Sequence, residues 1–423
     1  MQFVSTTGKG QVTSFRNAVL NNLPADGGLY IPKEIPLLDQ GFLEEIPNME
    51  LSDIAAIALR RFCGNDIDEA ALSAITKRVY NFPIPIKQVT SSIQCLELYH
   101  GPTYAFKDIG AKFLAECLSY FNSDRSRDTL VLVATSGDTG GAVANGFLGV
   151  EGVKVIILYP KGKVSELQEK QLTTLGQNII ALEVDGTFDD CQSMVKSAFA
   201  DRDLADDFNL SSANSINIAR WLPQSIYYYV PYQQGRANTV MSVPSGNYGN
   251  LTSGVLAQKM GIPIKRFIAG SNENDTVPRY LNSGFYEPAS TIPTLANAMD
   301  VSDPSNFIRL LALFDNSYDQ LRRNLDSFTL NDQGIKESIK RCWDENNYLT
   351  DPHGAIGYEA LRSTASEGIF LGTAHYCKFL PTMSNSLGEL VETPDFAAEL
   401  MSKEKNAVAI AADYGQLKDY ILN

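Results

Sequence analysis

Short apolar runs alternate with helical stretches from about residue 95 onward, and this alternation restricts the fold more than any other feature. The run at 129–134, Thr-Leu-Val-Leu-Val-Ala, is too short for a helix and rich in strand-forming residues. Further strands are expected at 153–159, 179–184, 239–243 and 264–269, and helices at 142–147, 165–176, 189–200 and 251–260. Strands separated by helices of this length are typical of parallel sheets. The sequence therefore predicts an α/β fold built of open parallel-rich sheets.

Residues 1–90 lack this alternation and are expected to form a small N-terminal domain. A helix is expected from Ser14 to Asn22, a short strand at 29–32 and a second helix at 51–62. Prolines interrupt the chain at 80–86, which marks the boundary. We expect a smaller α/β domain over 91–215 and a larger one over 216–423. The latter should be helical after residue 300, apart from a strand near 368–373.

The composition excludes several classes of protein. Lysine and arginine number 35 against 49 aspartates and glutamates, a net charge of −14 that argues against nucleic-acid binding. The chain begins without the pattern of a signal peptide and contains no apolar run long enough to span a membrane, so we expect a cytoplasmic protein. Six scattered cysteines and three histidines have neither disulfide nor metal-ligand spacing. No G-x-S-x-G motif of a serine hydrolase occurs.

One lysine, Lys107, lies among aromatic residues at the point where an apolar helix begins. Tyr104 and Phe106 precede it. Burial lowers the pKa of a lysine and frees its amine as a nucleophile that can form a Schiff base. The alternative is a lysine that packs its methylene groups on the aromatic rings and keeps its ammonium in water.

Two loops between an expected strand and an expected helix are suited to bind anions. The first, Ser245-Gly246-Asn247-Tyr248-Gly249-Asn250, has two glycines and no acidic residue, which suits a phosphate monoester at a helix N-terminus. The alternative is a tight turn without a ligand. The second, Ser136-Gly137-Asp138-Thr139-Gly140, offers backbone and hydroxyl donors for a substrate carboxylate, with Asp138 ready to accept a hydrogen bond. Its alternative is an ordinary aspartate helix cap.

A Schiff-base lysine, a phosphate loop and a carboxylate loop together match what pyridoxal 5'-phosphate and an amino-acid substrate require. Ten segments then show a resemblance to the threonine synthase family, in its bacterial and fungal long-chain form. They read DGGLYIP (26–32), ELYHGPTYAFKDIGAKF (97–113), ATSGDTGGAVANGF (134–147), ILYPKGKVSELQEKQLTTLG (157–176), FDDCQ (188–192), NSINIAR (214–220), VPSGNYGNLTSG (243–254), NDTVPRYL (274–281), NAMDVSDPSN (297–306) and FLGTAH (370–375). One departure is Tyr376-Cys377, where the family commonly has Pro-Ala.

The resemblance implies a pyridoxal-phosphate enzyme of fold type II, related to the β subunit of tryptophan synthase. It implies that Lys107, with Phe106 beside it, carries the cofactor and that the loop from Ser245 to Asn250 binds the cofactor phosphate. By the same resemblance, Asp138 lies near the cofactor's 3′-oxygen and Thr373 hydrogen-bonds its pyridine nitrogen. The implied substrate-phosphate residues are Ser212, Asn214 and Arg220.

The implied reaction converts O-phospho-L-homoserine and water into L-threonine and phosphate. Two alternatives stay open from the sequence. One is a phospholyase or dehydratase on the same scaffold that releases 2-oxobutyrate, and the other is a relative that binds a ligand without catalysis. His353 and His375 are interpreted as structural groups. We expect a monomer, with a dimer as the alternative.

Overall fold

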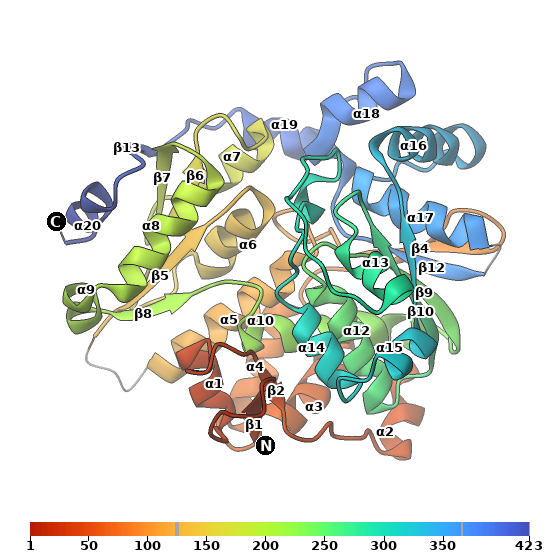
Figure 1. Cartoon of the computed structure of the whole chain (residues 1–423), viewed down its shortest axis with the longest axis horizontal. Coiled ribbons are helices and arrows are strands. Elements are labelled where there is room, and N and C mark those ends of the chain that lie inside the picture. The colour runs from red at the N-terminus through yellow and green to blue at the C-terminus, as the bar shows by residue number, and fades with distance from the viewer. Residues whose placement is uncertain (123–126, 365–366, 423) are drawn as a thin grey trace.

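Two open sheets, each with helices packed on it, hold most of the chain (Figure 1). The computed structural model describes residues 1–122, 127–364 and 367–422. All strands of the smaller sheet are parallel, and those of the larger sheet are parallel apart from one antiparallel strand at its edge. The prediction of open parallel-rich α/β sheets is therefore confirmed.

The larger sheet has six strands. In spatial order they are β11 (Leu325–Thr329), β10 (Ile264–Ser271), β9 (Thr239–Pro244), β12 (Gly368–Gly372), β4 (Ile93–Glu97) and β3 (Ile86–Gln88). Only β3 runs antiparallel to its neighbour. Strand β12 is buried throughout, and β9 and β10 are buried toward their carboxyl ends, because helices cover them, with α17 along β9, β10 and β12 and α12 against β9 and β10. The helices of this half are α12 (Gly249–Met260), α13 (Thr276–Ser283), α14 (Phe307–Leu313), α15 (Tyr318–Asn324), α16 (Asp332–Asn346), α17 (Pro352–Thr364), α18 (Leu380–Leu387) and α19 (Asp395–Met401).

The smaller sheet has five parallel strands. In spatial order they are β13 (Val408–Ala411), β7 (Ile179–Asp185), β6 (Val153–Pro160), β5 (Thr129–Ala134) and β8 (Asn209–Ser212). Helices α6 (Asp138–Phe147), α7 (Glu166–Thr173), α8 (Phe188–Ala200), α9 (Arg202–Asp207) and α20 (Tyr414–Leu422) accompany it. Leu130, Leu132, Ile156 and Leu158 point to one apolar cluster on this sheet because alternate residues of a strand share a face.

The N-terminal region packs below both sheets in Figure 1 and contains a two-stranded antiparallel sheet with short helices. Its elements are β1 (Phe3–Ser5), α1 (Phe15–Asn21), β2 (Tyr30–Pro32), α2 (Gln40–Glu45), the 3-10 helix η1 (Ile46–Asn48), α3 (Leu51–Cys63) and α4 (Glu69–Val79). Ser14 caps α1, as expected. Between the sheets lie α5 (Lys107–Asn122) and α10 (Ile218–Trp221), and α5 contacts both α6 and α10. The 3-10 helix η2 (Leu222–Tyr228) packs against α12, and α11 (Tyr229–Gln233) packs against η1 and η2.

The structure differs from the sequence predictions in several places. Helix α6 begins at Asp138 rather than at residue 142. Strand β11 lies inside the stretch that was expected to be helical, and that prediction was wrong because pairing with β10 stabilises a short segment that has no strand pattern of its own. Two strands also belong to a different sheet from the one that the domain ranges predict. Strand β4 was expected in the smaller sheet but lies in the larger one, and β13 was expected in the larger sheet but lies in the smaller one. The boundaries at 90/91 and 215/216 stay a prediction.

Across the described ranges, none of the helices combines the length and the apolar character needed to cross a membrane.

Candidate active site

Three segments meet where neighbouring strands of the larger sheet end. The loop from Ser245 follows β9, Thr373 follows β12, and the segment leading to Lys107 follows β4. Because β12 lies between β9 and β4, all three lie at the carboxyl edge of the sheet, where open α/β proteins bind ligands. The N–H of Phe106 donates to the carbonyl of Thr373 at 2.9 Å, so the lysine segment and the Thr373 segment are in direct contact.

Lys107 is the first residue of α5 and is half-buried. Its Nζ lies 5.9 Å from the centre of the Phe106 ring. Burial is the main cause that lowers the pKa of Lys107, while Asp138 raises it and Arg220 and Lys378 lower it further. The lowered pKa favours the free amine that the sequence analysis expected.

Tyr104 adopts a left-handed backbone conformation with φ of 56°. Its ring lies 4.5 Å from that of Phe396 on α19 and 6.4 Å from that of His375, between centroids. A non-glycine residue at positive φ is strained and persists only where its surroundings fix it. Tyr104 therefore ties the lysine segment to α19.

Hydrogen bonds from several elements hold the segment before Lys107. The N–H of Thr103 donates to Asp108 at 2.9 Å, and the carbonyl of Thr103 accepts from the Gln171 amide and from Lys378 Nζ, both at 2.9 Å. Burial raises the pKa of Asp108 to about 6. The backbone at Lys107 is thus fixed by α5, α7 and the turn after β12.

Asp138 forms a buried ion pair with Lys378, a residue that the sequence analysis did not assign to the site. Lys378 Nζ lies 2.6 Å from Asp138 Oδ1, and the Gln168 amide donates to the same oxygen at 3.0 Å. Burial alone would raise the pKa of Asp138, but Lys378 and Lys107 together hold it below its ordinary value. A lysine inside the mostly apolar stretch Cys377–Phe379 was the only sequence signal for this partner.

In the loop before α6, two backbone N–H groups already donate hydrogen bonds within the loop. The hydroxyl of Thr135 accepts from the N–H of Gly137 at 3.0 Å and from that of Gly140 at 2.9 Å. Those two groups are engaged within the loop, which leaves Ser136, exposed, and Thr139, half-buried, as the hydroxyls facing outward for a carboxylate. Gly137 has φ of 141°, and a Cβ there would lie 2.5 Å from Gln168, so only glycine fits.

The loop from Ser245 to Asn250 is fixed on all sides. Ser245 donates its N–H to Gly270 and its hydroxyl to Val243, both at 2.8 Å. Asn247 donates to Ser215 and accepts from the N–H of Ser305, both at 2.6 Å. Tyr248 takes φ of 60° and bonds Ser271 at 3.0 Å. The loop is therefore rigid before any ligand arrives.

The start of α12 presents buried donors. Asn250 accepts from the Tyr228 hydroxyl at 2.8 Å through Oδ1, whereas its buried Nδ2 has no partner among the described residues. The N-terminus of α12 adds positive potential at the same place. Buried unpaired donors in a native protein are rare and point to a partner such as a bound anion.

We expect replacement of Gly246 by alanine to disrupt this loop. A Cβ at Gly246 would lie 2.5 Å from Met299 Cα, so backbone must shift at a cost of about 1–3 kcal/mol in the free energy of unfolding. Urea denaturation measures this loss, and dialysis measures retention of a bound phosphate ligand. Gly249→Ala is the matched control, because its Cβ would meet only the Asn306 amide at 3.3 Å. Equal stability of the two variants would contradict the prediction.

Arg220, on α10, is buried with 2% of its surface exposed. Its guanidinium donates to the carbonyl of Ala213 at 2.5 Å, its Nε has no partner in the described part of the chain, and burial lowers its pKa to about 10. Ser212 is buried at the end of β8, but Asn214 is exposed. The structure thus brings Arg220 close enough to influence Lys107, while Asn214 lies at the surface.

A second buried arginine, Arg309, was missed by the sequence analysis. Its guanidinium donates to the carbonyls of Tyr30 at 2.9 Å and Ile216 at 2.5 Å and to Asn306 Oδ1 at 2.9 Å, and it lies 4.8 Å from the centre of the Trp221 ring. Burial lowers its pKa to about 9. Within the described ranges neither Arg220 nor Arg309 pairs with a carboxylate. Two buried arginines that form no ion pair with a described carboxylate therefore flank the segment 213–217.

Comparison with known proteins now identifies the family. Three family models match: "Threonine synthase N terminus" at 2–80, "Pyridoxal-phosphate dependent enzyme" at 87–372 and "Threonine synthase, C-terminal" at 354–421. Threonine synthase of Haemophilus influenzae is 43% identical over 420 residues, 97% of each chain, and that of Escherichia coli is 40% identical over 430 residues, the full length of both. The chain belongs to the threonine synthase family.

Solved structures of the family have the same fold. The crystal structure of the Escherichia coli threonine synthase superposes with a TM-score of 0.91 over the whole of both chains. The threonine synthase of Brucella melitensis, solved with pyridoxal phosphate bound, is 32% identical, has a TM-score of 0.94 and covers 100% of this chain and 98% of its own. The expected fold type and the expected cofactor, pyridoxal 5'-phosphate, are thereby confirmed.

The residues present fit this cofactor. Lys107 offers an amine of lowered pKa, and the unpaired Asn250 Nδ2 and the start of α12 offer donors for a phosphate. Thr373 is buried directly after β12, and its carbonyl accepts the N–H of Phe106, the residue before Lys107. The particular contact of each residue stays a prediction.

His353 and His375 both form hydrogen bonds within the fold, and their interpretation as structural groups stays a prediction. His375 caps the 3-10 helix η4 (Tyr376–Phe379) by accepting the N–H of Cys377 at 3.2 Å, and burial lowers its pKa to about 4. This cap keeps the turn in place although the family's usual proline is absent. His353 bonds Asp351 and accepts the N–H of Ala298 at 3.3 Å.

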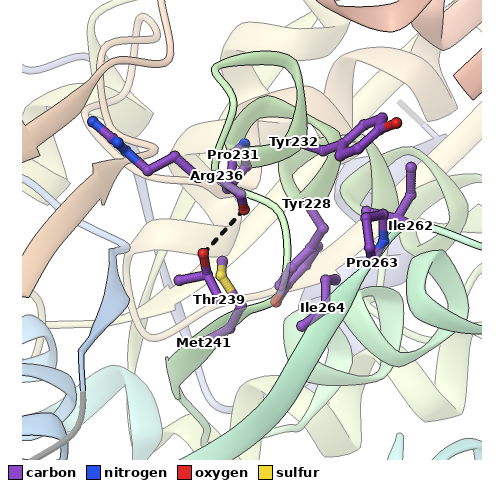
Figure 2. A pocket seen from close by; sticks show the side chains of 9 residues that line it. All are labelled: Tyr228, Pro231, Tyr232, Arg236, Thr239, Met241, Ile262, Pro263 and Ile264. Atoms are coloured by element: carbon purple, nitrogen blue, oxygen red, sulfur yellow. Dashed lines mark hydrogen bonds between the residues drawn. The ribbon is translucent and has the colours of Figure 1, made fainter. Parts of the chain in front are cut away.

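A small pocket elsewhere in the molecule does not belong to this site. Figure 2 shows its lining at the beginning of β9 and β10, with Thr239 donating to the carbonyl of Arg236 at 3.0 Å. Apolar side chains form most of its wall. The amino ends of parallel strands lie opposite the edge where α/β proteins bind ligands, and the pocket has no group suited to the family's chemistry.

Proposed function

We propose that this chain converts O-phospho-L-homoserine and water into L-threonine and phosphate. The observation that carries the proposal is the surplus of buried positive charge around the site. Lys378, Arg220 and Arg309 are buried, and among the described residues only Lys378 forms an ion pair with a carboxylate, that of Asp138. Unpaired buried charge is unfavourable, and a phosphorylated cofactor with a phosphorylated, carboxylate-bearing substrate supplies the missing negative charge.

The side chains then have distinct tasks. The bound cofactor supplies an electron sink that stabilises negative charge beside the amino-acid Cα. Lys107 would hold the cofactor before the substrate arrives and afterwards would remove protons from Cα and Cβ and return protons to Cγ and Cα. Its lowered pKa keeps the amine in the form that can accept a proton.

Substrate binding falls to two groups of residues. Arg220, a planar donor with an unpaired Nε, suits the substrate phosphate and the leaving phosphate, with Ser212 and Asn214 nearby in sequence. Ser136 and Thr139 hold the substrate carboxylate. Gly137 and Gly140 shape that loop, since Thr135 already takes their N–H groups.

A product assay separates this function from its alternative. We expect holoenzyme supplied with O-phospho-L-homoserine to form threonine and phosphate in equal amounts. In water enriched in ¹⁸O, the label should enter the threonine hydroxyl, because water adds at Cβ. Release of 2-oxobutyrate and ammonia in excess of threonine would instead establish a phospholyase.

The location and assembly of the protein are also proposals. We infer a cytoplasmic monomer, and light scattering after gel filtration distinguishes one chain from two.

A further inference from the structure

Lys378 is buried at the meeting point of three parts of the fold. Its ammonium, with no exposed side-chain surface, lies 2.6 Å from Asp138 Oδ1 at the start of α6 and 2.9 Å from the carbonyl of Thr103 in the lysine segment. Lys378 itself belongs to η4, after β12 of the larger sheet. One cation therefore connects the smaller sheet, the larger sheet and the segment that leads to Lys107.

Asp138 faces two lysines. Its negative charge acts on Lys378, to which it bonds directly, and on Lys107, whose pKa it raises. The other charged groups around this pair are Arg220, which acts on Lys107, and Asp108, on which Lys378 acts. An Asp138 without Lys378 would have Lys107 as its remaining partner of opposite charge.

We propose that Lys378 is a positioning residue: it forms an ion pair with Asp138 and so prevents that carboxylate from pairing with Lys107 and holding Lys107 in the protonated form. The inference rests on the proposed role of Lys107 as the residue that bonds the cofactor, since only a neutral amine can do so. A carboxylate that lies a few ångströms from a cation shifts a pKa by about 1–3 units. Lys378 itself lowers the pKa of Lys107 and so opposes the rise that Asp138 causes.

The test is the pH dependence of cofactor uptake by the full-length protein after removal of its cofactor. Pyridoxal phosphate is added at a series of pH values, and the rate at which the visible absorbance of the bound form appears is measured at each. The midpoint of this pH dependence reports the fraction of Lys107 present as the free amine. We expect Lys378→Met to move the midpoint upward by about 1–3 pH units. Lys378→Arg, which keeps the charge, should leave it near the wild-type value.

A double variant separates charge from mere structure. Lys378→Met combined with Asp138→Asn removes both charges, and we expect it to return the midpoint toward wild type. Asp138→Asn alone should lower the midpoint, which tests the proposal even if Lys378→Met fails to fold. Lys112→Met is the control. Lys112 lies on α5, as Lys107 does, but it is half-buried and forms an ion pair with Glu116 rather than with Asp138.

Two results would overturn the proposal. An unchanged midpoint in folded Lys378→Met means that Asp138 takes up a proton instead of capturing Lys107. A shifted midpoint that persists in the double variant means that Lys378 acts through the shape of the site. A wild-type protein that takes up cofactor but forms no threonine contradicts the proposed function alone.

Discussion

Replacement of Lys107 by alanine is expected to lower threonine formation by about 100- to 10,000-fold, the range typical of a lost general base. The loss should exceed that of any other single substitution, because Lys107 both holds the cofactor and moves protons at Cα and Cβ. Initial rates of phosphate release and of threonine formation measure it. The visible absorbance of bound cofactor should disappear on dialysis, since no amine remains to retain it.

Lys112→Ala is the matched control for this experiment. Both lysines are half-buried on α5, but Lys112 lies 3.4 Å from Glu116 and away from the strand ends. Its rate and spectrum should stay near those of the wild type. A Lys107→Ala protein that keeps wild-type turnover would show that the chemistry belongs to another residue.

Arg220→Met should lower kcat/KM by roughly 30- to 4,000-fold, which corresponds to about 2–5 kcal/mol for a lost buried charge contact. The loss should be expressed in KM, and inhibition by inorganic phosphate should weaken with it. The unfolding free energy of the cofactor-free protein should stay within about 1 kcal/mol of wild type, because methionine replaces a buried cation that has no carboxylate partner. Steady-state kinetics and urea denaturation test the two statements separately.

Arg220→Lys distinguishes charge from geometry. It keeps the positive charge but loses the planar pair of donors, so its kcat/KM should lie between those of wild type and Arg220→Met. If Arg220→Met unfolds readily and the KM of the surviving protein is normal, the arginine serves the fold by holding the carbonyl of Ala213 and not the substrate.

The predictions from sequence succeeded where the signal is local. β5 at 129–134 matches its predicted bounds because six consecutive apolar or β-branched residues can hardly be anything else. Lys107 was correctly placed at a helix start, and the two glycine-containing loops do lie between a strand and a helix. Each of these features depends on neighbours in the chain.

What the sequence did not show depends on contacts between distant residues. Lys378 is separated from Asp138 by most of the chain, and its pairing needs both sheets in place. Arg309 was overlooked because an arginine in a helix is usually exposed, whereas here three acceptors from separate segments surround it. Likewise, the sequence did not show that the backbone N–H groups of Gly137 and Gly140 donate to the hydroxyl of Thr135.

The pairing of β13 with β7 has a consequence for how the protein is made. Residues 408–411 close one edge of a sheet whose other strands are all synthesised before residue 213. During translation that side of β7 stays unpaired while β9 to β12 of the larger sheet are produced, and an open strand edge invites pairing with other chains. A chain that ends before residue 408 lacks this pairing, and we expect it to aggregate more readily than the full-length chain.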